Sequence, residues 1–462
     1  MHRSTRHVIV SFAVASFALA SACSSGGALR PPEREAGVPS GDDGSIGPPQ
    51  VTTSLTYYRD VKPILEEKCV MCHHDGGIAP FALDAFEKIG DHVGKMAEVI
   101  PAKVMPPWPP NDSCNHYYRD RSLSDAQIKT LTEWATGGAP AGNPGDYVPV
   151  TVPSLGLSRT DLELKIPVAY TPTKRPDDYR CFLVDWPETT TKYITGFGVS
   201  PGKVPIVHHA IAFYAAPSQV AAYQKLDDDE PGPGYTCFGG PGTNDAGWIS
   251  GWAPGQLGTD FPVGTGIKME PGSKIILQIH YNTLKTPPSA DQTTMTMKLD
   301  DHVDKEAAVV RFLDPRWVSG KTMTIKAEDP DAMHSFTFDP TPYVSRFGSP
   351  VLVDGKAMTI WSAGLHMHTR GTHAKLSILP ASGADTCLID IPKWNFHWQG
   401  SYGLEKPITF NPGDQLKIEC HWDNTAPNQP TDASGNPLPV TDLNWGEKTT
   451  DEMCLGFMYV TQ

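Results

Sequence analysis

The sequence predicts a mainly β protein, built from antiparallel β-sandwiches that follow a small helical domain. Short runs at 275–281, 294–299 and 415–420 are β-branched or alternate apolar with polar residues, which is typical of strands in sandwiches. The 42 glycines and 44 prolines favour turns between such strands. Residues 151–462 exceed the roughly 100 residues of one ordinary sandwich. We therefore expect two sandwiches packed against each other, at 151–310 and 311–462.

The chain begins with a predicted export signal, residues 1–22. Basic residues precede an apolar run from Val8 to Leu19 that is too short for a stable membrane span. Small residues then lead to Cys23, a pattern that resembles a bacterial lipoprotein signal; an ordinary cleaved signal peptide is the alternative. We expect a lipid-anchored protein that faces the periplasm or the cell surface. Residues 23–54 are rich in Gly, Pro, Ser and acidic residues and predict a flexible tether.

Residues 55–150 predict a small helical domain around Cys69-Val70-Met71-Cys72-His73. Cys-x-x-Cys-His is the attachment motif of a c-type haem, in which both thiols bond the vinyl groups and the histidine binds the iron. A helix is expected over 57–68, and a second one starts at the Ser124–Gln127 capping box and ends at Gly137-Gly138. The alternatives are a redox dithiol or half a zinc site, but no second Cys-x-x-Cys is present.

The sixth haem ligand is expected to be Met105. It lies in Val104-Met105-Pro106-Pro107-Trp108, where the prolines stiffen the backbone that carries the sulfur. Met96, His92 and His116 are rival ligands. The whole stretch resembles the cytochrome c modules that are fused to many bacterial periplasmic enzymes.

Charge and cysteine content limit the partners and the compartment. A net charge of −14 argues against a nucleic-acid partner, since there is no basic surplus to neutralise phosphates. Of nine cysteines, six remain after Cys23 and the Cys-x-x-Cys pair are set aside. An even number suits an oxidising compartment, but spacing alone does not give their pairing.

Two sets of soft or neutral ligands are candidates for copper. His366 and His368 would face the same way on a strand, and the thioether of Met453 favours Cu(I). His208 and His209 could share one metal only if their strand ends or bulges there. His280 would complete that set. Taken alone, His280 is more often a hydrogen-bonded sheet residue than a ligand.

The context of these residues resembles the copper type II, ascorbate-dependent monooxygenases, the family of the peptidylglycine α-hydroxylating and dopamine β-hydroxylating enzymes. The matching segments occur in the family's order: the His208-His209 pair, Gly251-Trp252-Ala253-Pro254-Gly255, Gln278-Ile279-His280-Tyr281, Leu365-His366-Met367-His368, Asn395-Phe396-His397-Trp398-Gln399, Cys420-His421-Trp422-Asp423-Asn424-Thr425 and Asp451-Glu452-Met453-Cys454.

This resemblance implies two tandem jelly-roll-like sandwiches that flank a solvent-filled cleft. One copper, at His208, His209 and His280, would transfer electrons. The other, at His366, His368 and Met453, would bind O2 and substrate and carry the catalysis. The resemblance also suggests a Cys420–Cys454 disulfide. Cys181–Cys237 is expected as a second, and Cys114 and Cys387 are left unassigned.

Three positions depart from the peptide-hydroxylating relatives. Gly364 stands where those enzymes have an arginine, and Leu455 and Phe457 stand where they have an asparagine and a tyrosine. The groups that grip a substrate carboxylate are therefore missing from these positions. We expect a neutral or apolar small molecule rather than a peptide that ends in glycine.

The sequence thus predicts a copper-dependent monooxygenase that hydroxylates a C–H bond with O2. Its cofactors would be two copper ions and one covalent haem. Electrons would come from an ascorbate-like reductant or a periplasmic redox protein and pass through the haem. The alternative is a haem–copper electron carrier or copper-handling protein without hydroxylase activity.

Overall fold

The computed structural model describes residues 54–152, 156–243, 246–320, 322–346, 351–432 and 434–462. The expected export signal, the lipid attachment at Cys23 and all but the last residue of the tether lie outside these residues. Within the described ranges, no helix combines the length and the hydropathy that a membrane crossing requires.

The helical region has its own apolar core. A π-helical turn, η1 (Tyr57–Val61), runs into α1 (Lys62–Lys68), so the helix expected over 57–68 is present. The capping box of Ser124 and Gln127 starts α3 (Asp125–Thr136), as the sequence predicts. The remaining helical segments are η2 (Phe86–Lys88), η3 (Gly90–His92), α2 (Val93–Val99) and η4 (Pro144–Asp146). Their apolar faces meet around Trp134 and Leu131, which are fully buried.

The described residues after 156 form three β-sheets. The largest has the order β1 (Leu162–Lys165), β10 (Thr294–Asp300), β3 (Lys192–Ser200), β8 (Thr265–Met269), β11 (Lys305–Phe312), β18 (Leu455–Thr461), β13 (Met358–His366) and β16 (Ser401–Phe410), with β7 (Thr259–Asp260) paired to β3. The second is β5 (Tyr235–Thr236), β2 (Asp177–Asp185), β9 (Lys274–Asn282), β4 (Val207–Ala215) and β6 (Gly247–Trp252). The third is β12 (Ala332–Phe338), β17 (Gln415–Trp422), β14 (Gly371–Leu379) and β15 (Thr386–Ile391). The prediction of a mainly β, antiparallel architecture is confirmed.

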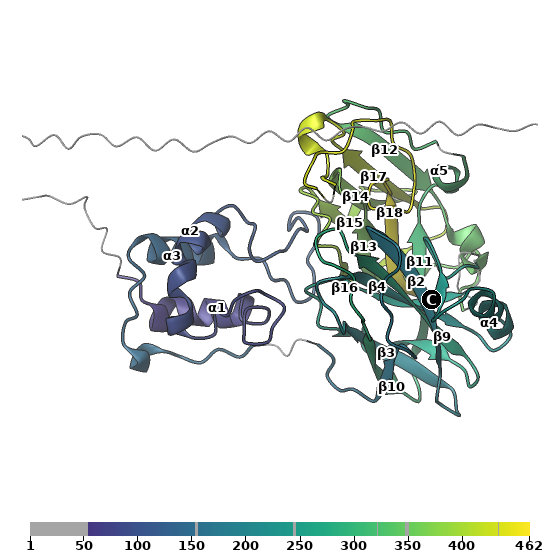
Figure 1. Cartoon of the computed structure of the whole chain (residues 1–462), viewed down its shortest axis with the longest axis horizontal. Coiled ribbons are helices and arrows are strands. Elements are labelled where there is room, and N and C mark those ends of the chain that lie inside the picture. Colours follow the sequence, from purple (N-terminus) through teal and green to yellow (C-terminus); the bar gives the residue numbers. More distant parts are fainter. Residues whose placement is uncertain (1–53, 153–155, 244–245, 321, 347–350, 433) are drawn as a thin grey trace, which may run out of the picture. The chain divides into compact units, whose positions relative to one another are not determined.

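The largest sheet is shared by both halves of the β region. Its first four strands share one hydrophobic core with the five-stranded sheet, and its last four share another with the four-stranded sheet. β8 and β11 join the halves by a short parallel pairing, Lys305 with Thr265 and Glu306 with Gly266. β11 runs across the expected domain boundary at 310/311. Figure 1 shows β12, β17, β14 and β15 together in the upper part of the β region, with β3 and β10 at its lower end.

Along β11, successive side chains face different cores, as the period of a strand requires. Ala308 and Val310 pack into the core of the second half, whereas Ala307 and Val309 pack into the core of the first half. The β11–β18–β13 part of the sheet is therefore a wall between the two halves. The β region also contains two short α-helices, α4 (Val220–Asp228) and α5 (Pro315–Gly320), and two 3-10 helices, η5 (Thr341–Arg346) and η6 (Ala426–Asn428).

Among the described residues, three disulfides cross-link the chain: Cys114–Cys387, Cys181–Cys237 and Cys420–Cys454. The last two confirm the expected pairings, and the first pairs the two cysteines that the sequence left unassigned. Cys114–Cys387 joins the segment that precedes α3 to β15. Three disulfides indicate folding in an oxidising compartment and hence export.

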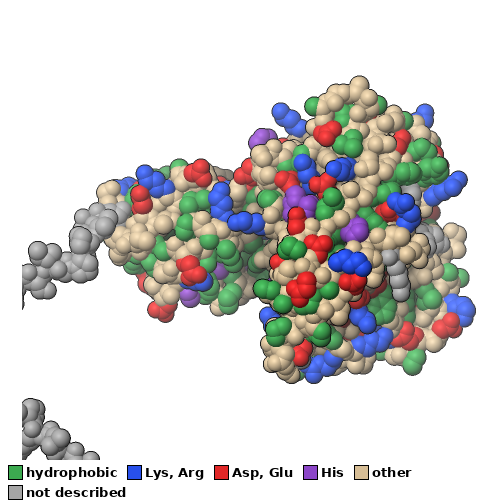
Figure 2. Space-filling view, turned by 90° about the horizontal axis from the view of Figure 1, so that it is seen from above, with side chains coloured by type: hydrophobic (Ala, Val, Ile, Leu, Met, Phe, Trp, Pro, Cys, Tyr) green, Lys and Arg blue, Asp and Glu red, His purple; other side chains and the backbone are tan. Residues whose placement is uncertain are grey.

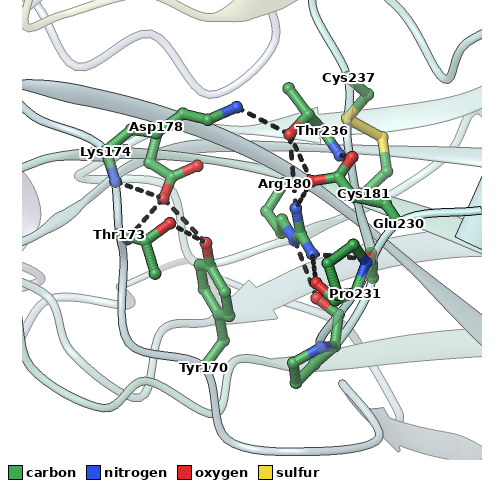
Figure 3. A network of polar contacts seen from close by, with 12 residues as sticks. Tyr170, Thr173, Lys174, Asp178, Arg180, Cys181, Glu230, Pro231, Thr236 and Cys237 are labelled. Atoms are coloured by element: carbon green, nitrogen blue, oxygen red, sulfur yellow. Dashed lines mark hydrogen bonds and ion pairs between the residues drawn. A yellow bond between two sulfur atoms is a disulfide. The ribbon is translucent and has the colours of Figure 1, made fainter.

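A polar network holds β2 beside the Cys181–Cys237 disulfide (Figure 3). The guanidinium of Arg180 pairs with Glu230 and donates to the carbonyl oxygens of Pro233 (2.8 Å) and Gly234 (2.7 Å). On the same strand, Asp178 accepts from the hydroxyl of Tyr170 at 2.8 Å. These contacts satisfy buried charges, and they fix the strand that carries Asp177 and Tyr179.

Many surface charges are paired across short distances. On the face of the molecule in Figure 2, acidic and basic side chains are interspersed. Lys274 lies 2.5 Å from Asp185, and Lys298 lies 2.7 Å from Asp260. Exposed pairs of this kind contribute at most about 1 kcal/mol each, so the stability of the β region comes mainly from its two cores.

Candidate metal centres

A β-bulge brings three histidines together. β4 and β9 pair Val207 with Tyr281 and His209 with His280, so His208 is an extra residue between the two pairs. The sequence predicts that His208 and His209 can bind one metal only if their strand ends or bulges there, and the bulge is present. Ring nitrogens of His208, His209 and His280 all lie within 4.8 Å of one another. The Nδ1 atoms of His208 and His209 are 3.2 Å apart.

The surroundings of His280 suit a metal ligand. Its Nε2 lies 2.9 Å from Oδ1 of Asp177, an acceptor, so Nε2 carries the proton. Its Nδ1 is buried and has no hydrogen-bond partner among the described residues. The ring of Tyr179 stacks on the imidazole at 4.0 Å and fixes its plane. A buried imidazole nitrogen without a partner, beside two others, fits a three-nitrogen copper site.

His366 and His368 form the second set. His366 is the last residue of β13 and His368 lies two residues on, with ring centroids 5.2 Å apart and ring planes nearly perpendicular. Nδ1 of His366 donates to Oε1 of Gln399 (2.5 Å), and Nδ1 of His368 donates to the carbonyl of Asp451 (3.1 Å). Because each Nδ1 is used, Nε2 is the nitrogen left to bind a metal.

Met453 is held next to this pair. Its neighbour Glu452 is fully buried and accepts from the backbone N–H groups of His368 (3.0 Å) and Arg370 (2.7 Å) and from Nε1 of Trp422 (2.8 Å). Burial raises the pKa of Glu452 to about 7. Cys454, on the other side of Met453, is bonded to Cys420. Met453 is 6% exposed and lines the same cavity as both histidines. Met367 is fully buried in the core.

Burial keeps the imidazoles of four histidines neutral, which is the form that binds metals: His208, His209, His366 and His368. It lowers the pKa of His208 and of His209 well below the usual 6.5, and neighbouring histidines add to the effect. Burial likewise lowers the pKa of His366 to about 4 and that of His368 to about 3. A cluster of uncharged donors in a dry setting can take up copper without first losing protons.

Residues of both sets line one cavity of ≈ 180 Å³: His208 and His209 of the first set, and His366, His368 and Met453 of the second. Ring centroids of His209 and His366 are 6.3 Å apart across it, and the ring of Phe396 stacks on His208 at 4.5 Å. The rest of its wall is mainly apolar and aromatic, including Trp248, Leu455 and Phe457. A second cavity of ≈ 800 Å³ shares several wall residues with the first, among them Trp248, Trp252, Gln256, Gln399 and Phe457.

Gly364 has a structural reason to lack a side chain. A Cβ there would lie 2.3 Å from Cζ of Phe457 and 2.7 Å from the carbonyl oxygen of Gly400. The Phe457 ring therefore occupies the space that a larger residue would need, and the ring of Trp248 stacks on it at 5.6 Å.

The Cys-x-x-Cys-His segment lies in the turn after α1. Among the described cysteines, Cys69 and Cys72 are the only ones outside disulfides. Burial raises the pKa of Cys69 to about 12, whereas reactive redox dithiols have a lowered thiol pKa. Nδ1 of His73 lies 3.1 Å from the carbonyl of Phe81, which leaves Nε2 for iron. The residues present fit a c-type haem better than a redox dithiol.

The position of the sixth haem ligand stays a prediction. Met105 is half-buried, and its backbone N–H donates to the carbonyl of Val99 at 3.4 Å. Of its rivals, Met96 is packed in the helical core, and His92 stacks on the ring of Phe81 at 3.8 Å.

Sequence reasoning missed the residues that orient the ligands. Gln399 and Glu452 lie in the segments that carried the family resemblance, so they could have been singled out there. Asp177 had no signal in the sequence, because it reaches His280 only through the pairing of β2 with β9.

One known protein family matches the C-terminal part of the chain. Residues 350–461 match the family model described as copper type II ascorbate-dependent monooxygenase, C-terminal domain. This match supports a copper-dependent oxidoreductase that uses O2, consistent with a reductant as co-substrate. No curated protein matches the chain.

Solved structures give only slight likenesses. The infectious bursal disease virus VP2 subviral particle is 10% identical, covering 68% of this chain and 74% of its own, with a TM-score of 0.14. The PBSX exported protein XepA is 7% identical, covering 59% and 89%, also with a TM-score of 0.14. TM-scores this low carry no argument about fold or function.

Proposed function

We propose that the protein is a copper-dependent monooxygenase that hydroxylates a C–H bond of a small organic molecule, with electrons relayed through a c-type haem in the same chain. The main support is that residues of both donor sets line one cavity: His208 and His209, which lie beside His280, and His366, His368 and Met453. The family match over 350–461 covers the second set.

The two sets have different roles in this proposal. Three imidazoles with a carboxylate behind one of them suit a site that passes electrons. Two imidazoles and a thioether favour Cu(I) and leave coordination open, which suits the site where O2 and substrate react. Copper bound at both sets would supply the two single electrons that the insertion of one oxygen atom into a C–H bond requires, with the other oxygen atom and two protons leaving as water. The chain's own residues hold the ligands: Asp177, Gln399 and the carboxylate of Glu452 fix their orientation.

The haem would bind covalently at Cys69 and Cys72, with His73 as one axial ligand and Met105 as the other. It supplies a one-electron carrier between an ascorbate-like or protein donor and the coppers. The sequence of residues 1–23 supports export and a lipid anchor at Cys23. In this proposal, the two halves of the β region are the tandem jelly-roll-like sandwiches that the resemblance implies.

The second candidate is an electron carrier or copper-handling protein. The apolar and aromatic lining of the cavity argues against this candidate, because an electron carrier does not need a substrate-sized apolar cavity beside an open metal site. A copper-handling role would instead favour exposed ligands from which the metal could be passed on.

The test uses the reduced, copper-loaded protein with ¹⁸O2 and a panel of small organic molecules. The proposal expects labelled oxygen in an organic product. Met453→Ile should lose this product while the haem spectrum stays unchanged. A full yield of product from Met453→Ile would refute the assignment of the second set. Oxygen consumption without label in any product would favour the carrier.

A further inference from the structure

The cavity wall contains one arginine, Arg311, that the proposed function does not use. Among the described residues its guanidinium has no hydrogen bond and no ion pair, although burial is deep enough to lower its pKa. An arginine keeps its charge even so. Arg311 is half-buried. The two fully buried arginines among the described residues are satisfied: Arg180 pairs with Glu230 (Figure 3), and Arg370 donates to Gln429 at 2.8 Å. Arg311 is therefore an uncompensated cation that faces the cavity.

Strand register places Arg311 in the row that lacks a carboxylate anchor. β11 pairs Arg311 with Phe457 of β18, and β18 pairs Phe457 with Gly364 of β13. By the alternation along β11, Arg311 is on the same face as Val309, toward the first half of the β region. The positive charge that the sequence finds missing at Gly364 is thus present two strands away.

The same register gives the distance from Arg311 to the second metal set. His366 is one two-residue step beyond Gly364 on β13. Strands about 4.8 Å apart with a rise of about 3.4 Å per residue place the Cα atoms of Arg311 and His366 about 12 Å apart. An extended molecule of several carbons could span from the guanidinium to the metal.

The other ionisable group that could neutralise Arg311 does not do so. Glu447 lines the same cavity but makes no ion pair with Arg311. Burial raises the pKa of Glu447 to about 7, with a smaller contribution from Asp451, so its negative charge is weakened at neutral pH. The wall residues nearest to Arg311 along β11 and β18 are apolar: Leu313, Leu455 and Phe457.

We propose that Arg311 binds a carboxylate of the substrate, so that the substrate is an apolar molecule with one carboxylate several bonds from the carbon that is hydroxylated. The inference rests on the proposed function. A guanidinium fork matches a carboxylate with two parallel hydrogen bonds, which a single cation in an apolar wall can provide without other polar groups. This substrate class departs from the uncharged substrate that Gly364, Leu455 and Phe457 suggest. Because the anchor lies two strands from Gly364, it would not reproduce the grip on a peptide's terminal glycine.

The test compares binding of octanoate and octanamide to the full-length protein by calorimetry under argon, so that no turnover occurs. A charge-assisted pair predicts that octanoate binds roughly tenfold to a hundredfold more tightly than octanamide. Arg311→Gln should abolish that preference and keep octanamide binding, whereas Arg311→Lys should keep part of it. Arg316→Gln is the matched control, because Arg316 pairs with Asp314 at the surface, away from the cavity; it should behave as the wild type.

Equal affinity of the wild type for the two probes overturns the inference, and this result needs no variant to fold. A preference that survives Arg311→Gln overturns it as well. The measurement is repeated on copper-free protein. A preference for octanoate that disappears when copper is removed would mean that the carboxylate binds copper, and this result also overturns the inference about Arg311. If the preference depends on Arg311 but no ¹⁸O enters any product, the anchor stands and the monooxygenase proposal fails.

Discussion

Removing the charge of Asp177 should weaken copper at the first set alone. Oδ1 of Asp177 accepts from Nε2 of His280 (2.9 Å), Nδ2 of Asn282 (2.8 Å) and Oγ1 of Thr449 (2.9 Å). Burial alone would raise the pKa of Asp177, but these hydrogen bonds and the adjacent imidazole hold it below its usual value. The residue is therefore a carboxylate at neutral pH, and it polarises the imidazole toward the metal.

The expected size follows from the hydrogen bond that changes. Asp177→Asn keeps an acceptor oxygen and loses the charge, which turns a charge-assisted bond of about 1.5–3 kcal/mol into a neutral one of about 0.5–1.5 kcal/mol. A difference of about 1.4 kcal/mol is a tenfold loss of copper affinity, at the lower end of what outer-shell changes usually cost. Asp177→Ala leaves Nε2 of His280 without a partner and should approach a hundredfold loss.

Competition with a Cu(I) chelator measures both sites in one titration. Asp177→Asn should shift one step by about tenfold and leave the other unchanged. Asp390→Asn is the matched control, because Asp390 makes a similar pair with His373 (2.7 Å) outside the cavity. It should shift neither step. An unchanged curve for Asp177→Asn, or equal shifts in the two variants, would refute the account of the first set.

Two further predictions concern packing and pH. Gly364→Ala should lower the free energy of unfolding, measured in urea, by about 1–3 kcal/mol, because its Cβ would clash with Phe457. Gly251→Ala is the control and should have little effect, because its Cβ would meet nothing closer than 3.8 Å. Equal losses in the two variants would contradict the packing argument. In the copper-free protein, burial lowers the pKa of His366 to about 4 and of His368 to about 3, so the unfolded chain takes up protons first and stability falls as pH drops below 6.5. For His366 the loss of unfolding free energy is on the order of 3 kcal/mol by pH 4. His366→Gln should make the unfolding free energy depend less on pH, as measured by urea titrations at pH 7, 6 and 5. An unchanged pH dependence in this variant would contradict the prediction.

The candidate ligands could be selected from the sequence because their spacing carries local geometry. His366 and His368 are two residues apart next to a strand end, and His208 and His209 are adjacent, so the need for a bulge followed from strand periodicity. The strands themselves were predictable from alternation, as in β10, where every second side chain is buried.

Long-range pairing could not be predicted. Asp177 lies 103 residues from His280 and reaches it only across β2 and β9. Six cysteines allow 15 pairings, so nothing in the sequence joined Cys114 to Cys387. The large shared sheet depends on a parallel contact of two residue pairs between β8 and β11, which is too short to leave a pattern in the sequence.

Substrate recognition shows the same limit. Gly364 leaves no room for an arginine side chain at that position, because the ring of Phe457 occupies the space. Arg311 fills the charge deficit from two strands away, and only the register of β11, β18 and β13 reveals this.

X-ray absorption of the copper-loaded, reduced protein, combined with a metal count, tests the central claim most directly. Two coppers per chain are expected, and only one of them should have a thioether sulfur ligand. Met453→Ile should remove the sulfur signal while the imidazole signal remains. One copper per chain, or a sulfur signal that persists in Met453→Ile, would contradict the two-site account.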